Sequence, residues 1–130
     1  MTQLKKTQVK AVKLALDAFE NTVRAAMRAA LAESRREQSG SAAEVHDLGD
    51  ESVADELLAI NSALAERHGH ELHLVERARQ RITEGEIGIC ADCAGDIALE
   101  RLIANPVAER CVTCESRRER THAHAATPRL

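Results

Sequence analysis

The stretch Cys90-Ala-Asp-Cys93, followed further along by Cys111-Val-Thr-Cys114, decides how the C-terminal part of this 130-residue chain folds. Each Cys-x-x-Cys pair can bend its backbone around one metal ion, and four thiolates complete a tetrahedral shell that leaves no position for a catalytic water. The pattern therefore predicts one structural Zn²⁺ per chain, held by Cys90, Cys93, Cys111 and Cys114. The alternative, a thioredoxin-like redox pair, expects a βαβ setting that the sequence lacks, and it leaves the second pair unexplained.

Apolar residues between the two cysteine pairs predict a small core around the ion. They are Ile97, Leu99, Leu102, Ile103 and Val107. Gly95 follows the first pair and allows a left-handed turn there, because glycine adopts a positive φ without steric cost. In so small a module, the bound metal supplies stability that the core alone cannot.

Toward the N-terminus, two apolar stripes predict two long helices, because their members recur every three or four residues. The first stripe is Val9, Val12, Leu16, Phe19, Val23, Ala26 and Ala30. The second is Val53, Leu57, Ile60, Leu64, His68, Leu72, Val75 and Ile82, and its register slips near His68. Each stripe is too narrow for a globular core but fits the other, so we expect a mainly α fold built on an antiparallel helical hairpin. A three-helix bundle is the alternative.

The predicted domains follow from these patterns. Residues 1–84 form the coiled-coil hairpin, residues 85–120 form the four-cysteine zinc-finger module with a C-terminal helix, and residues 121–130 form a flexible tail. Turn-like composition at 38–41 and 47–50 places the reversal of the hairpin between about Gly40 and Asp50. Asp50 or Ser52 is placed to cap the second helix.

Charge is distributed unevenly along the hairpin. No Lys or Arg lies between residues 38 and 66, a segment whose carboxylates are Glu44, Asp47, Asp50, Glu51, Asp55, Glu56 and Glu66. At the start of the chain, Lys5, Lys6, Lys10 and Lys13 all precede the first acid, Asp17. The sequence therefore predicts an acidic tip near residues 44–52 and a basic start, although a solvated helix face explains the lysines equally well.

Composition narrows the function classes. A net charge of −3 argues against a main role on the nucleic-acid backbone, which favours a basic face. The longest stretch without Asp, Glu, Lys or Arg covers only 57–65, against about 20 residues for a membrane-spanning helix. Charged residues from Lys5 onward interrupt any signal peptide, so we expect a cytoplasmic protein without a membrane partner. The four-cysteine shell leaves no position for a catalytic water, and we do not expect the protein to be an enzyme.

The segment Gly85-Glu-Ile-Gly-Ile-Cys90-Ala-Asp-Cys93-Ala-Gly-Asp-Ile97, with Arg101-Leu-Ile-Ala-Asn-Pro106-Val-Ala-Glu-Arg-Cys111-Val-Thr-Cys114, resembles the zinc-finger signature of the DksA/TraR family. Asp47 and Asp50 precede Cys90 by the spacing at which that family carries an Asp-x-x-Asp-x-Ala motif at its coiled-coil tip. Ser52 stands in place of the alanine.

The resemblance implies a transcription regulator that binds RNA polymerase rather than a specific DNA sequence. Its coiled coil would enter the secondary channel, so that the tip residues Asp47, Asp50 and Ser52 act near the catalytic centre. Family members that respond to guanosine tetraphosphate use basic side chains where this chain has Leu74, Asn105 and Glu115, with Arg67 retained. A requirement for guanosine tetraphosphate is therefore not expected.

Three alternatives remain open at this point. A nucleic-acid-binding zinc finger would place a basic surface on the metal module, where the sequence has five arginines against six acids. A Gre-like cleavage-stimulating factor also presents an acidic coiled-coil tip, but its second domain is β-rich and lacks this metal site. The third alternative is an inert structural zinc protein.

Overall fold

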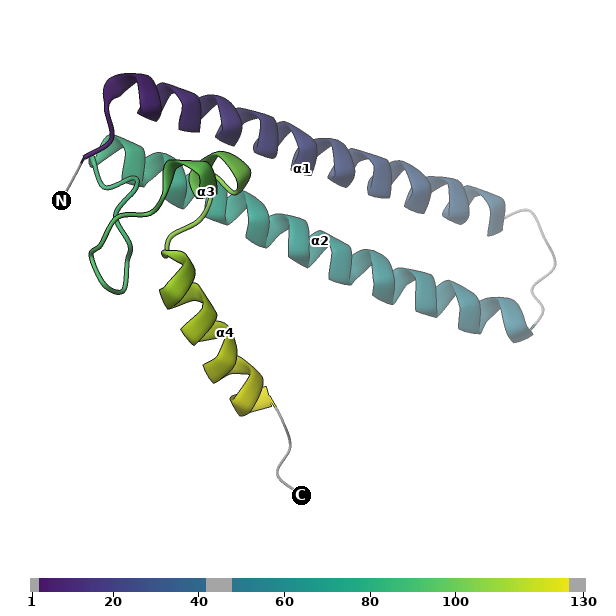
Figure 1. The fold of residues 1–130 in the computed structure, drawn as a ribbon. Coiled ribbons are helices and arrows are strands. Elements are labelled where there is room, and N and C mark those ends of the chain that lie inside the picture. Colours follow the sequence, from purple (N-terminus) through teal and green to yellow (C-terminus); the bar gives the residue numbers. More distant parts are fainter. Residues whose placement is uncertain (1–2, 42–47, 127–130) are drawn as a thin grey trace. The chain divides into compact units, whose positions relative to one another are not determined.

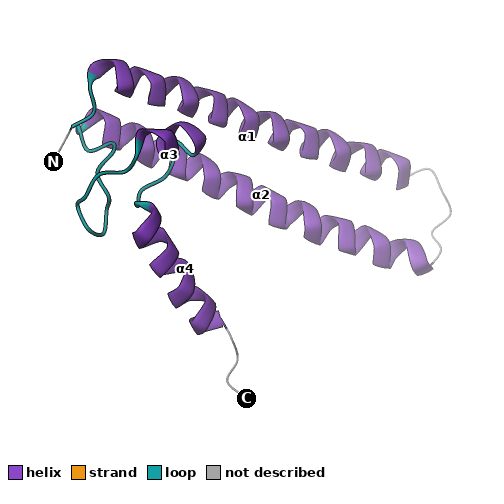
Figure 2. Cartoon of the chain, in the orientation of Figure 1, coloured by secondary structure: helices purple, strands orange, loops and turns teal. Residues whose placement is uncertain are grey.

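A computed structural model describes residues 3–41 and 48–126 of the chain (Figure 1). Four helices form in these residues: α1 (Lys6–Ser41), α2 (Leu48–Thr83), α3 (Leu99–Ala104) and α4 (Val112–Ala126). Figure 2 shows the loops around α3, and the part of the chain described contains no strand, only an isolated antiparallel bridge between Ile89 and Asp96. The prediction of a mainly α fold is confirmed. None of the described helices has the length and apolarity needed to cross a membrane.

The chain divides into two compact units, and α1 and α2 each contribute to both. We call residues 18–74 the hairpin unit, and residues 1–17 with 75–130 the zinc-finger unit. The domain boundaries after residues 84 and 120 stay a prediction. α4 continues to Ala126, so it includes the first part of the segment predicted as a tail.

In the hairpin unit, the later part of α1 and the early part of α2 run antiparallel (Figure 1). The first stripe faces inward as predicted: Val23 is buried, and Phe19, Ala26 and Ala30 are half-buried. The second stripe is only partly correct, because the side chain of Ile60 is 51% exposed. The half-buried face of α2 runs instead through Asn61, Leu64 and His68, at spacings of three and four residues. Ile60 is rotated off this face.

The helix boundaries near the reversal differ from the predicted ones. α1 continues to Ser41, so the turn-like residues 38–41 belong to the helix. α2 begins at Leu48, which places Asp50 and Ser52 inside its first two turns and corrects the prediction that either caps it. Acidic residues in the first turn of a helix are favourable there, because the free N–H groups carry partial positive charge.

The core of the zinc-finger unit draws on all four helices and the connecting loops. Its buried members form one cluster, which consists of Val12, Ile87, Cys90, Ile97, Leu102, Ala108 and Cys114. Leu4 and Val9 near the start of the chain pack against this cluster, as do Ile82, Leu99 and Cys111. The N-terminal residues therefore close the core of the metal module.

Four of the five predicted core residues are buried or half-buried, and Ile103 is the exception with 43% exposure. Leu102 is fully buried, and its neighbour Ile103 is turned about 100° away on the short helix α3. So short a helix can bury only one face. The prediction that Ile103 belongs to the core is wrong for this reason.

Candidate metal centre

The four cysteines predicted as ligands meet at one place in the zinc-finger unit. Their sulfur atoms all lie within 4.8 Å of one another, and Cys93 Sγ lies 3.9 Å from Cys111 Sγ. Four thiolates held about 2.3 Å from a tetrahedral Zn²⁺ would be about 3.8 Å apart. The spacing of the sulfurs thus fits zinc. Among the described residues, no other group of three or more His, Cys, Asp or Glu residues is placed to hold a metal.

The first cysteine pair lies on a tight reversal of the chain. The Cys90 N–H donates to the Gly95 carbonyl at 2.8 Å, and the Ala94 N–H donates to the Cys90 carbonyl at 3.0 Å. The Gly95 N–H points at Cys93 Sγ over 3.4 Å, which stabilises negative charge on that sulfur.

Ala94, not Gly95, adopts the left-handed conformation, with a φ of 59°. The left-handed turn that Gly95 allows thus lies one residue earlier. Gly95 is needed for a different reason, because a Cβ at this position would lie 3.2 Å from Cys93 Sγ.

We expect Ala94→Gly to stabilise the zinc-finger unit by about 1 kcal/mol, because an L-residue in the left-handed region costs about 1–2 kcal/mol. A rise in melting temperature of about 5 °C corresponds to this gain. Ala91→Gly in the same loop is the control, since Ala91 has a negative φ and should gain nothing. Equal melting temperatures for wild type and Ala94→Gly would contradict the assignment of strain to Ala94.

The second cysteine pair lies at the start of α4, which Cys111 directly precedes. The Cys111 carbonyl accepts the N–H of Glu115 at 2.9 Å, and Cys114 lies buried in the first turn of the helix. A helix N-terminus favours a thiolate, because its free N–H groups carry partial positive charge. A hydrogen bond from the Ala91 N–H to the Glu109 carbonyl, at 2.8 Å, ties the first pair to the segment that leads into the second.

The thiols differ in their affinity for protons. Burial acts to raise the pKa of Cys90, but the N–H groups of Cys93, Cys111 and Asp92 outweigh it and lower the pKa to about 6. The pKa of Cys114 is raised to about 12, first by its hydrogen bond with the Cys111 thiol and then by burial. Four thiolates so close together need a cation. Donor set and spacing both fit zinc, so Cys90, Cys93, Cys111 and Cys114 form a structural zinc site. A Zn²⁺ ion bound there would cross-link the two cysteine pairs.

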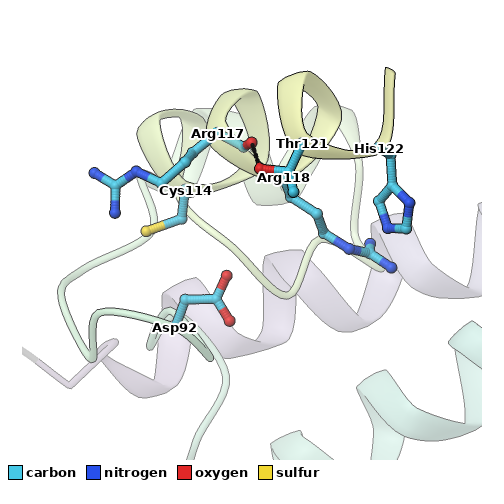
Figure 3. A pocket seen from close by; sticks show the side chains of 6 residues that line it. All are labelled: Asp92, Cys114, Arg117, Arg118, Thr121 and His122. Atoms are coloured by element: carbon cyan, nitrogen blue, oxygen red, sulfur yellow. Dashed lines mark hydrogen bonds between the residues drawn. The ribbon is translucent and has the colours of Figure 1, made fainter. Parts of the chain in front are cut away.

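A hollow of about 250 Å³ beside Cys114 is bordered by Asp92 and by Arg117, Arg118, Thr121 and His122 of α4 (Figure 3). In Figure 3, the side chains of Arg117 and Arg118 point in opposite directions. Asp92 is engaged by Arg110, whose Nε lies 2.9 Å from Asp92 Oδ2. The two arginines do not converge on one point, so the hollow does not form an anion-binding site.

Residues 83–120 match the family model of the prokaryotic dksA/traR C4-type zinc finger. The chain carries a DksA/TraR zinc finger. The fold of the whole chain is similar to that of transcription factor DksA2 from Pseudomonas aeruginosa. The TM-score is 0.76, the match covers 92% of this chain and 89% of that chain, and the sequence identity is 22%. None of the curated proteins matches the sequence. The family resemblance and the structural zinc predicted from the sequence are confirmed.

The structure does not describe the side chains of the three predicted tip residues. Asp47 lies outside the described residues, and Asp50 and Ser52 belong to α2 but their side chains lie outside the described part. A role for these three residues stays a prediction.

Sequence reasoning missed the arginines that hold the DksA/TraR finger in shape. Arg101 Nε donates to the Arg110 carbonyl at 3.0 Å, and Arg81 donates to two further carbonyls of the finger. The acceptors are backbone groups, which leave no mark on the sequence. The position of an arginine in a helix therefore gives no sign of this role.

Proposed function

We propose that the protein is a transcription regulator that acts by binding RNA polymerase and has no catalytic chemistry of its own. The observation that carries the proposal is the DksA/TraR finger at residues 83–120 within a fold similar to that of transcription factor DksA2. The zinc ion has a structural part in this proposal, since its four protein ligands leave no open coordination position.

The mechanism we propose places the hairpin in the secondary channel of the polymerase. Residues 18–74 contain eleven acidic and five basic residues, and the acids concentrate around the reversal of the chain. Carboxylates at the end of a narrow helix pair can reach a site that globular surfaces cannot. Near a bound Mg²⁺ or basic channel residues they interact strongly, because little water is present to screen them. Asp47, Asp50 and Ser52 are the residues we assign to this contact.

The regulator we propose does not need guanosine tetraphosphate. At the positions where responsive relatives have basic side chains, Leu74 is half-buried and Asn105 is uncharged. Glu115 is negative and lies 3.9 Å from the Arg110 guanidinium. These three side chains supply no cation for a phosphate.

The alternatives receive less support. The case for a nucleic-acid-binding finger is weakened, because two of its arginines are already engaged within the finger. Arg101 donates to the Arg110 carbonyl, and the Arg110 side chain donates to Asp92. The β-rich second domain of a Gre-like factor is not found among residues 3–41 and 48–126.

Photo-cross-linking to core RNA polymerase tests the proposal. We expect the wild-type protein to co-purify with the core enzyme, with an affinity that guanosine tetraphosphate changes less than tenfold, about 1.4 kcal/mol of coupling. A photoreactive residue at position 52 should cross-link to polymerase segments that border the catalytic centre. The same residue at position 122, on exposed α4, should give different products. A zinc-loaded protein that fails to bind the core enzyme would refute the proposal.

A further inference from the structure

Arg81 lies in the last turn of α2 and reaches into the zinc finger. Its Nη2 donates to the Ile89 carbonyl, and its Nη1 donates to the Glu109 carbonyl at 3.4 Å. Ile89 directly precedes the ligand Cys90, and Glu109 stands two residues before the ligand Cys111. One guanidinium therefore holds the chain segments that lead into both cysteine pairs.

Glu109 provides a second link to α2. Its side chain is only 10% exposed, and its carboxylate forms an ion pair with Arg77, whose Nε lies 2.9 Å from Glu109 Oε1. Arg77 and Arg81 are four residues apart and so lie on one face of α2. A carboxylate this buried needs a cationic partner, because removal from water penalises an unpaired charge.

The backbone of Arg81 takes part in the end of α2. The Glu86 N–H donates to the Arg81 carbonyl at 2.8 Å, and the Gly85 N–H donates to the Ile82 carbonyl at 3.1 Å. Gly85 has a φ of 73°. This combination is a Schellman motif, which ends the helix with a glycine in the left-handed region. Arg81 thus takes part in the helix end with its backbone and in the finger with its side chain.

We infer that Arg81, assisted by Arg77 through Glu109, is a positioning residue that couples the zinc ligands to α2. The guanidinium holds the two cysteine-bearing segments together, so that Cys90 and Cys111 stay near the spacing that zinc requires. Both arginines precede residues 83–120, the segment that matches the family model. The ligand geometry of the finger therefore depends on a helix outside it, whether or not the protein binds polymerase.

Transfer of zinc from the full-length protein to a chromophoric chelator tests this role. Arg81→Gln should release zinc at least tenfold faster than wild type, because glutamine cannot donate to both carbonyls. Arg79→Gln is the matched control: Arg79 lies two residues away on α2, and its guanidinium pairs with Asp17 of α1 at 2.8 Å. It should release zinc at the wild-type rate. Arg81→Lys should fall between these two, since lysine keeps the charge but lacks the planar fork.

Hydrogen exchange at the Ala91 amide gives a readout that helix stability alone would not change, since this amide bonds the Glu109 carbonyl. It should exchange faster in Arg81→Gln and stay protected in Arg79→Gln. If Arg81→Gln does not fold, Arg81→Lys and Arg77→Gln carry the same test. Wild-type zinc release and Ala91 protection in the Arg81 variants would overturn the inference. Equal effects of Arg79→Gln and Arg81→Gln would also overturn it, because the loss would then reflect only the charge of α2.

Discussion

Replacing Cys111 by serine should remove the zinc ion and unfold the zinc-finger unit, while residues 18–74 stay helical. A serine hydroxyl does not ionise at neutral pH, so the shell would keep only three thiolates. A structural zinc contributes about 10–16 kcal/mol in zinc-finger peptides, as much as the whole stability of about 5–15 kcal/mol of an ordinary domain. The buried cluster of this unit includes two of the ligands themselves, Cys90 and Cys114, so the core cannot compensate.

Metal analysis and thermal unfolding monitored by circular dichroism measure this effect. We expect the Cys111→Ser protein to contain less than a tenth of the wild-type zinc and to lose the unfolding transition of the zinc-finger unit. Thr113→Ser is the control, because Thr113 is exposed and lies between the two ligands of the second pair. A strong chelator added to the wild type should reproduce the Cys111→Ser melting curve. Full zinc content and an unchanged melt in Cys111→Ser would show that the four sulfurs are not a metal site.

The metal centre was the feature that the sequence predicted best, and the reason is chemical. Thiolates that share one ion must come in a fixed number at short spacings, so the ligands can be identified without knowledge of the fold. The left-handed residue was harder to place. A glycine near a turn suggests a positive φ, but Gly95 is required by its approach to Cys93 Sγ, while Ala94 takes the positive φ. Two different constraints act on neighbouring residues, and a sequence shows only that glycine is present.

Helical periodicity predicted the first stripe better than the second. Each member of the first stripe is buried or half-buried, because it keeps the alternating three and four spacing without a break. In the second stripe, His68 and Leu72 follow Leu64 at intervals of four, and Ile60 falls outside the packed face. A polar residue, Asn61, takes its place on that face. Periodicity locates a stripe, but it cannot resolve a shift of one residue where polar and apolar side chains mix.

The contribution of the N-terminus to the finger could not be predicted at all. Leu4 packs against the cluster around the zinc ligands, and a Cβ on Gly88 would lie 3.1 Å from the Leu4 side chain. Val12 was assigned to the helical stripe, and it is also a fully buried member of this cluster. These contacts join residues that lie far apart in the sequence. Local patterns carry no information about pairing at such a distance.

The tip aspartates should prove essential for regulation and dispensable for binding. Asn retains the side-chain acceptor that turns and helix starts use, so Asp47→Asn and Asp50→Asn remove charge with little loss of local structure. Asp50 lies in the first turn of α2, where loss of a negative charge costs about 0.3–1 kcal/mol. This cost is too small to unfold a helix of 36 residues.

If the charges act inside the polymerase channel, each variant should abolish the effect on open-complex lifetime and promoter output, while co-purification with the core enzyme persists. Glu66→Gln is the matched control, because it removes an exposed charge from the same helix, several turns beyond Asp50. It should regulate as the wild type does. Loss of polymerase binding in the Asn variants would instead make the aspartates docking residues. A double Asn variant with wild-type regulation would limit Asp47 and Asp50 to shaping the reversal of the chain, and the active contact would then have to lie elsewhere on α1, α2 or the zinc finger.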